Sequence, residues 1–399
     1  SLTMIGWFSL ASTAYALKFL WAPMVDKMPI PFLSSALGQR RAWIILSQSL
    51  VALSMLGLGS MDPSQELSWV AIWAVALATA SATQDIAVDA YRIESLDEEQ
   101  LGAGSANYVL GYRVAMLVAG AGALFVADIW NWSVAYGVMA SLMSIGIVTV
   151  LVSPEPKNFS AEKKEIHEHE LGHFLGKHVG QFNFLHIVAV KLYDAVICPF
   201  ADFVSRPNWI LILLFVALYK YGEALLGIMA NPFYLDMGFS KSEIAAVSKG
   251  YGLTMTLIGG YLGGILVARY GIMKSLLYAG ILQCFANMAF ALQAYVGYSV
   301  PMLAVTISVE NLTAGMATTA FIAYLSSLCN VAYTATQFAL LTSLMNMTRT
   351  VFSSWGGWLA DHMDWISYFV LTTFAAIPGL IVLLMLIRRL PIQDTYSVH

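Results

Sequence analysis

The sequence contains little charge. Of its 399 residues, 11% are charged, against roughly 25% in an average soluble domain. Hydrophobic residues make up 59% of the chain, and its mean hydropathy is +0.71. This composition excludes an ordinary water-soluble domain. The formal net charge of −4 adds little, and no nucleic-acid partner is predicted.

Cysteine is also scarce. The three cysteines, Cys198, Cys284 and Cys329, have no paired spacing, and the last two lie in apolar runs. They suggest neither a disulfide framework nor a metal cluster, and no metal or cofactor is predicted. The first apolar stretch is too long, and lacks the basic leader, for a cleavable signal peptide.

What the chain has instead is long apolar runs. A run of about 18 or more apolar residues is typical of a transmembrane helix. The sequence predicts a polytopic α-helical membrane protein with eleven spans, near 4–25, 42–60, 69–91, 105–127, 132–152, 209–232, 243–268, 272–293, 300–328, 334–359 and 365–387.

The basic residues predict the orientation of these spans. Fourteen lysines and arginines fall on one side of the predicted helices and only Lys241 on the other. Cytoplasmic loops carry the excess of Lys and Arg, so the side with fourteen is predicted to be cytoplasmic.

A long polar connection over 153–208 divides five predicted spans from six. The stretches "ADIWNW" (127–132) and "ADHMDW" (360–365) share the pattern A-D-x-x-x-W at an offset of 233 residues, which places the fourth span opposite the tenth. Parallel repeats around a central loop indicate the major facilitator fold, with two bundles of six helices.

On this fold the first bundle is one helix short. With the 26–41 loop cytoplasmic, the chain would begin outside, so an additional first helix is expected upstream of Ser1. The predicted domains are an N-terminal bundle of five spans (1–152), a cytoplasmic linker (153–208) with an amphipathic segment along the membrane surface, a C-terminal six-helix bundle (209–390) and a cytoplasmic tail (391–399).

Four ionisable residues approach the membrane midplane, where transporter sites form. At 1.5 Å per residue, Arg113 lies roughly 14 Å into its span, Lys220 and Glu223 about 16–21 Å, and Glu310 about 15 Å. A charge there costs at least ~2.5–3.5 kcal/mol, which favours a function. The guanidinium fork of Arg113 suits a carboxylate or phosphate, or an interhelical salt bridge. Lys220 and Glu223, three residues apart, can also neutralise each other, and Glu310 can form a buried polar pair with Asn311.

Asp85 and Asp89 lie nearer the cytoplasmic edge. Their spacing of four puts both carboxylates on one helix face, where like charge and desolvation oppose ionising both together. This arrangement suits a proton-coupling group near the inner gate. The alternative is a structural clasp in which the two carboxylates pair with Arg92, Lys18 or Lys27.

Two further patterns have plainer interpretations. "HELGH" (169–173) matches the H-E-x-x-H zinc motif, but it lies in a charged loop without an obvious third ligand, so a solvated polar segment is favoured over a metalloprotease site. "GGYLGG" (259–264) is predicted to be a site of close helix packing rather than a ligand loop.

Five stretches together resemble the AmpG-type muropeptide permeases of the major facilitator superfamily. They are "IGWFSLASTAYALKFLWAPMVDK", "SATQDIAVDAYRIE", "ALYKYGEALL", "VENLTAGMATTAFIAYLSSLCN" and "ATQFALLTSL". The resemblance implies import of 1,6-anhydro muropeptides across the bacterial inner membrane, driven by protons, for cell-wall recycling and β-lactamase induction. A monomer among membrane lipids, without enzymatic activity, is expected. A permease for another large anion, such as acetyl-CoA, is the alternative.

The resemblance and the buried charges together give the candidate site residues. The residues expected to couple protons are Asp85, Asp89, Glu223 and Glu310. Those expected to bind substrate carboxylates, hydroxyls and amides are Lys18, Gln84, Asn107, Arg113, Lys220, Asn311, Gln337 and Arg349, with Tyr or Trp faces packing on sugar rings.

Overall fold

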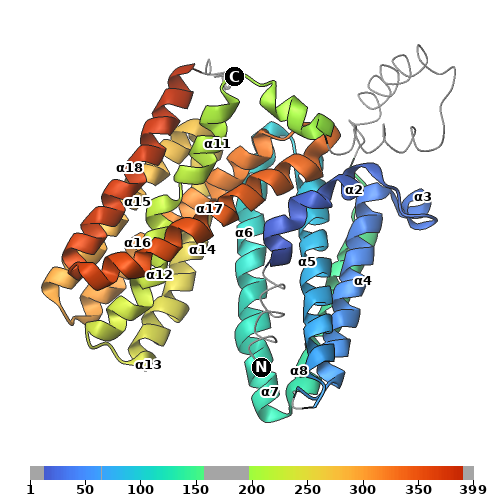
Figure 1. Ribbon diagram of the computed structural model, residues 1–399, viewed down its shortest axis with the longest axis horizontal. Coiled ribbons are helices and arrows are strands. Elements are labelled where there is room, and N and C mark those ends of the chain that lie inside the picture. The colour runs from blue at the N-terminus through green and yellow to red at the C-terminus, as the bar shows by residue number, and fades with distance from the viewer. Residues whose placement is uncertain (1–12, 64, 157–196, 390–399) are drawn as a thin grey trace. The chain divides into compact units, whose positions relative to one another are not determined.

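A computed structural model describes residues 13–63, 65–156 and 197–389, apart from the side chain of Lys249. The ordered elements in these ranges are helices, and no strand occurs in them (Figure 1). The predicted all-α class is therefore confirmed. The HELGH stretch, most of the predicted amphipathic linker and the tail lie outside the described residues.

Nine helices in the described part of the chain are long and apolar enough to cross a membrane. They span Gln39–Ser60, Leu67–Ser95, Glu98–Ile129, Trp132–Val152, Trp209–Asp236, Lys241–Tyr270, Ile272–Val296, Val300–Ser327 and Trp365–Arg389. The predicted span 334–359 corresponds to helix α17 (Thr334–His362), which is too polar to qualify. The first predicted span begins outside the described residues. The count of eleven is therefore not confirmed.

The chain divides into two compact units. Unit 1 comprises Ser1–Asp97, Val114–Ser205 and Leu328–Ser343, and unit 2 comprises Glu98–Arg113, Arg206–Ser327 and Leu344–His399. The division at 205/206 falls in the predicted central connection. Residues 98–113 and 328–343 are each grouped with the other half of the chain.

In unit 1, helix α4 (Gln39–Ser60) packs against both α5 (Leu67–Ser95) and α8 (Trp132–Val152). Short elements η1 (Lys18–Leu20) and α2 (Ala22–Lys27) contact α5. Small side chains allow the close approach. One core cluster of this unit consists of Ala22, Val25, Ile44, Ile86, Ala87, Ala90, Ala335 and Ala339.

In unit 2, helix α16 (Val300–Ser327) packs against α14 (Gly252–Tyr270) and α15 (Ile272–Val296), and α15 packs against α18 (Trp365–Arg389). Aromatic rings fill one end of this unit. Those buried in its core cluster are Phe233, Tyr234, Phe239, Phe290, Tyr368 and Phe369.

The GGYLGG glycines bring α14 and α16 into contact. A Cβ atom on Gly259 would overlap the carbonyl of Leu312, and one on Gly263 would lie 2.8 Å from the Cα atom of Met316. Such spacing allows helix backbones to meet, as in other small-residue interfaces. The prediction of close packing at this sequence is confirmed.

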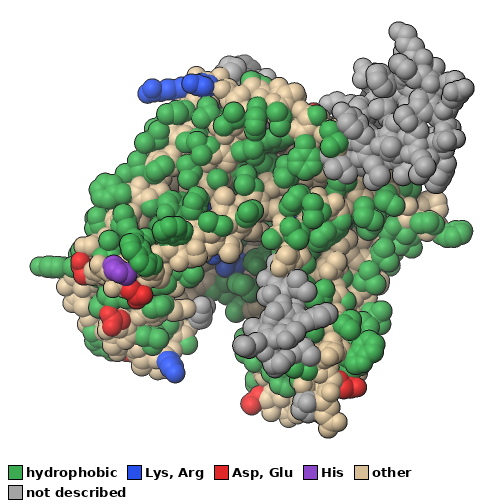
Figure 2. Space-filling view, in the orientation of Figure 1, with side chains coloured by type: hydrophobic (Ala, Val, Ile, Leu, Met, Phe, Trp, Pro, Cys, Tyr) green, Lys and Arg blue, Asp and Glu red, His purple; other side chains and the backbone are tan. Residues whose placement is uncertain are grey.

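The surface of unit 2 is hydrophobic along its helices and charged at their ends. Figure 2 shows this distribution, with basic side chains at one end of α18 and acidic and histidine side chains near the other. Arg388 and Arg389 occupy the last turn of α18, and His362 the last turn of α17. An apolar band between charged ends suits a helix bundle surrounded by lipid.

Candidate functional site

One predicted span is broken at its middle. Helix α11 (Trp209–Leu218) and helix α12 (Tyr221–Asp236) form a single candidate span of 28 residues, but Tyr219 and Lys220 between them are not helical. Lys220 is the N-cap residue of α12, with φ −99° and ψ 12°. Discontinuous helices of this kind form the binding sites of many transporters.

Helix α18 packs closely against the broken segment. A Cβ atom on Gly379 would lie 2.9 Å from both the Leu218 carbonyl oxygen and the Tyr219 Cα atom. The Tyr219 hydroxyl donates a hydrogen bond of 2.8 Å to the carbonyl of Leu276. The backbone at the break is therefore held between two neighbouring helices.

The break positions an ion pair. The Lys220 ammonium lies 2.9 Å from Glu223 Oε2 and donates a hydrogen bond of 2.7 Å to the Thr318 hydroxyl of α16. The two charged side chains are 17% and 23% exposed. Lys220 and Glu223 thus neutralise each other, which is one of the two interpretations predicted from the sequence. Both side chains remain partly exposed.

Glu310 belongs to the same charge cluster. Asn311 Nδ2 donates to Glu310 Oε2 at 2.6 Å, and Asn311 Oδ1 accepts from the Thr256 hydroxyl at 2.8 Å. Glu310 also interacts electrostatically with Arg113, Lys220 and Glu223. Glu310 therefore interacts with each of the other three predicted midplane charges, all of which lie in unit 2.

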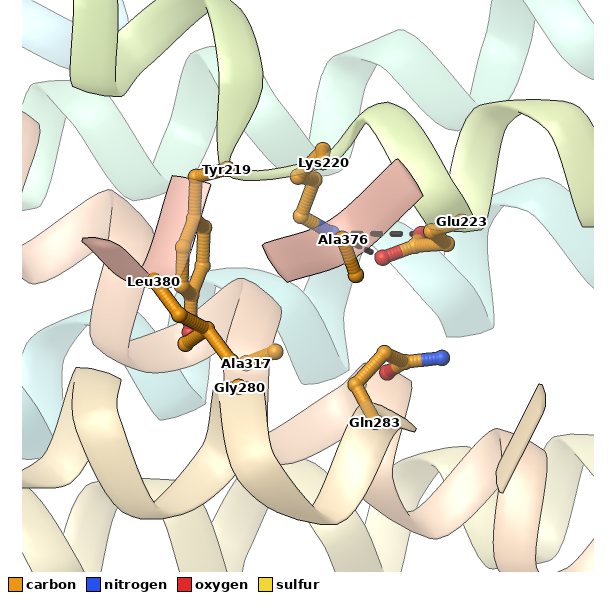
Figure 3. Close-up of a pocket in the computed structure, with 8 residues that line it drawn as sticks. All are labelled: Tyr219, Lys220, Glu223, Gly280, Gln283, Ala317, Ala376 and Leu380. Carbon is orange, nitrogen blue, oxygen red and sulfur yellow. Dashed lines mark hydrogen bonds and ion pairs between the residues drawn. The ribbon is translucent and has the colours of Figure 1, made fainter. Parts of the chain in front are cut away.

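A small cavity lies beside the ion pair. Its volume is about 10 Å³, and Figure 3 shows the eight residues that line it. They are Tyr219, Lys220, Glu223, Gly280, Gln283, Ala317, Ala376 and Leu380. Gln283 and Thr318 were not among the residues predicted from the sequence. A glutamine inside the apolar run of α15 was the available signal for the first, whereas Thr318 is recognisable only from its contact with Lys220.

The carboxylates of α5 are also paired with cations. Asp85 forms an ion pair with Lys18, which is almost completely buried. Asp89, 3% exposed, lies 3.4 Å from Arg92. Two of the pairings expected for a structural clasp are therefore present, and Gln84 beside them is half-buried.

A second network in unit 1 was not predicted. The Arg40 guanidinium bonds to Asp26 Oδ1 at 2.8 Å and to both oxygens of Glu94, the shorter contact being 2.5 Å. Asp26 in turn accepts hydrogen bonds of 3.1 and 2.8 Å from the backbone N–H groups of Ala335 and Thr336. Glu94, which ends the acidic stretch of α5, thus has a structural role.

The remaining candidates differ in their surroundings. Gln337 is 1% exposed, and its amide bonds to Pro199, Asp202 and Asn330. Because these contacts occupy the amide, we leave Gln337 out of the proposed substrate site. Asn107 and Arg349 are exposed. No group of three or more potential metal ligands occurs in the part of the chain that the structure describes.

Comparison with known proteins identifies the family. Residues 1–292 match the model of the Major Facilitator Superfamily. The anhydromuropeptide permease of Escherichia coli (strain K12) is 36% identical over 386 residues, which cover 96% of this chain and 72% of that protein. A Rickettsia felis protein named AmpG 4 is 36% identical over 390 residues, covering 97% of this chain and 89% of the relative.

Solved structures of this superfamily show the same fold. The proton:xylose symporter XylE matches with a TM-score of 0.66 and 12% identity, over 98% of this chain and 88% of its own. The fucose:proton symporter FucP of E. coli matches with a TM-score of 0.67 and 11% identity, over 96% and 92%. The major facilitator fold predicted from the repeat is confirmed, and the chain is a multi-pass membrane protein that belongs to the AmpG-type permeases of the Major Facilitator Superfamily.

Proposed function

We propose that the protein is a proton-coupled secondary transporter that imports 1,6-anhydro muropeptides across the bacterial inner membrane for cell-wall recycling. The observation that carries the proposal is the Lys220–Glu223 pair at the break between α11 and α12. A salt bridge at an interruption of a membrane-crossing helix combines a cation for an anionic substrate with a carboxylate for a proton.

The chemistry of the cluster suits a muropeptide. Such a molecule carries carboxylates, hydroxyls and amides on a bulky disaccharide. Lys220 and Arg113 provide cations for carboxylates, and Arg113 Nε has no hydrogen-bond partner among the described residues. The Asn311 amide, already bonded to Glu310 and Thr256, holds the Glu310 carboxylate in this cluster. The relative named anhydromuropeptide permease supports this choice of substrate.

Coupling follows from competition for the cation. A substrate carboxylate that binds Lys220 draws the ammonium away from Glu223. The carboxylate then lacks its compensating charge in an apolar setting, where an unpaired charge is costly. A proton taken up by Glu223 removes that cost. Substrate and proton therefore bind more favourably together than separately.

The pairs of unit 1 offer a second coupling point. Asp85 is bound to Lys18 and Asp89 to Arg92, so protonation of either carboxylate releases a cation. We propose that Asp85 takes part in coupling near the cytoplasmic end, because its side chain is 30% exposed and thus open to exchange.

Uptake by purified protein in liposomes tests the proposal. With an inward proton gradient, wild-type protein is expected to accumulate labelled N-acetylglucosaminyl-1,6-anhydro-N-acetylmuramic acid, and a protonophore to abolish the accumulation. Asp85→Asn should lose uphill accumulation while still inserting in the membrane. The control Asp361→Asn changes an exposed carboxylate at the end of α17 and should behave as wild type.

Competition experiments test the substrate. Anhydro muropeptides should compete with the labelled disaccharide, and reduced muropeptides and acetyl-CoA should compete at least tenfold more weakly. Competition by acetyl-CoA alone would refute the proposed substrate in favour of another large anion. Full accumulation by Asp85→Asn would refute the coupling role of that residue.

A further inference from the structure

The amide of Gln283 is buried without a partner. Gln283 lies on α15 and is 7% exposed, and neither its Nε2 nor its Oε1 atom has a hydrogen-bond partner in the described structure. Leaving one such buried donor or acceptor unpaired costs about 1–3 kcal/mol. Native interiors therefore satisfy these groups, often with an ordered water.

The Gln283 side chain lines the small cavity at the helix break. Figure 3 shows it extending from α15 toward the side of the cavity where Lys220 and Glu223 meet. The cavity volume of about 10 Å³ approaches the space that one water molecule needs. A bound water also needs two to four polar partners. The lining provides the Gln283 amide, the Glu223 carboxylate and the Lys220 ammonium.

The next turn of α15 also carries a buried amide with an unpaired polar atom. Asn287 is completely buried. Its Nδ2 atom donates a hydrogen bond of 3.1 Å to the carbonyl of Thr372, whereas its Oδ1 atom has no hydrogen-bond partner among the described residues. Two buried amides with unpaired atoms, one helical turn apart, thus lie on one face of α15. This pattern favours a hydrated polar track over a packing defect at one residue.

We propose that the cavity binds one water molecule, which Gln283 positions against Glu223 and which delivers protons to that carboxylate. The Gln283 amide holds the water through its unpaired donor and acceptor. A proton that reaches this water passes to the Glu223 carboxylate, and the water is regenerated. When Lys220 turns to a substrate, the same water remains hydrogen-bonded to Glu223. Gln283 is then a positioning residue for coupling, an inference that rests on the proposed transport function.

Two substitutions test this role by transport. Gln283→Met keeps the approximate length of the side chain and removes the amide, whereas Gln283→Asn keeps an amide. Gln283→Met is expected to lower proton-driven accumulation of the labelled anhydro disaccharide at least tenfold, with counterflow exchange at zero gradient within about twofold of wild type. Gln283→Asn should accumulate more than Gln283→Met.

The control for these variants is on the same helix. Gln293 is also completely buried, but its amide is satisfied by the Gly297 carbonyl at 2.7 Å and by the Thr306 hydroxyl at 3.4 Å. Gln293→Met should lower thermal stability and leave the ratio of accumulation to counterflow unchanged. Wild-type accumulation by Gln283→Met, or equal loss in Gln283→Met and Gln283→Asn, would overturn the role of the amide.

Thermal stability tests the water independently of transport. If the amide were dry, its replacement by methionine would remove an unsatisfied polar group, and the melting temperature would rise by about 3 °C or more. If a water is bound, the melting temperature of Gln283→Met should stay the same or fall. A rise would overturn the water site. Absence of uptake by the wild type would instead refute the proposed function, and the melting comparison would still decide the water site.

Discussion

Asn131 and Asp364, 233 residues apart, cap equivalent helices in the two halves of the chain. The Asn131 side chain accepts a hydrogen bond of 2.9 Å from the N–H of Val134 at the start of α8. Asp364 accepts one of 3.0 Å from the N–H of Ser367 at the start of α18. Both residues stand directly before the tryptophan of the A-D-x-x-x-W repeat. The repeat in the sequence thus preserves the same helix start in each half.

These caps respond differently to pH. Hydrogen bonds from the Ser367 N–H and hydroxyl hold the pKa of Asp364 below its ordinary value of 3.8. A lowered pKa in the folded state means that the cap stabilises α18 above that ordinary value and loses this contribution as the pH falls through the folded-state pKa. The Asn131 amide does not titrate. Acid should therefore lower the hydrogen-exchange protection factors, measured against the intrinsic exchange rate at each pH, at the first turn of α18 and leave those of α8 unchanged.

Substitutions provide the control for this prediction. Asn131→Ala should cost about 1 kcal/mol of stability at any pH. Asp364→Asn keeps a capping oxygen without the charge and should abolish the acid effect at α18. An equal acid response at both helix starts would contradict the prediction.

A second prediction follows from the close packing of α14 and α16 at Gly259. Gly259→Ala places a methyl group against the Leu312 carbonyl, and α14 and α16 must separate. We expect a loss of about 1–3 kcal/mol, measured by thermal unfolding in detergent. The control is Gly227→Ala on α12, where a Cβ atom meets nothing within 4 Å. Equal melting temperatures for the two variants would show that the helices tolerate the methyl group.

The Arg40 network makes a third prediction. Arg40 is 7% exposed and binds Asp26 and Glu94 at once through its planar fork. Lysine keeps the charge but cannot reproduce these directed bonds. Arg40→Lys should therefore lower the free energy of unfolding by about 2 kcal/mol or more, whereas Arg388→Lys at the exposed end of α18 should have no effect. Unchanged unfolding of Arg40→Lys would mean that charge alone holds the network.

A double-mutant cycle addresses the Lys18–Asp85 pair. Lys18 is 3% exposed at its side chain and Asp85 30%. Lys18→Met leaves Asp85 without its cation and should cost about 1–3 kcal/mol, less than a fully buried pair would because water reaches Asp85. Adding Asp85→Asn should restore much of the loss. Additive effects of the two substitutions would show that the pair contributes no coupling energy.

The sequence predicted the parts of the site that depend on local spacing. Lys220 and Glu223 are three residues apart in an apolar run, so their pairing follows from helix geometry. The Arg40 network joins residues 14 and 54 positions apart, a separation that helical periodicity does not reveal. The break at Tyr219 was also missed, because neither Tyr219 nor Lys220 is a glycine or proline and the packing against the break comes from Gly379 on another helix.

The polarity of α17 has a consequence for biogenesis. A segment too polar to qualify as a span by itself partitions poorly from the translocon into lipid. The following helix, α18, has the highest hydropathy of the nine candidate spans, 2.5. We therefore expect α17 to enter the bilayer together with α18 as a helical hairpin, so that the turn between them becomes a determinant of correct insertion as well as of folded stability.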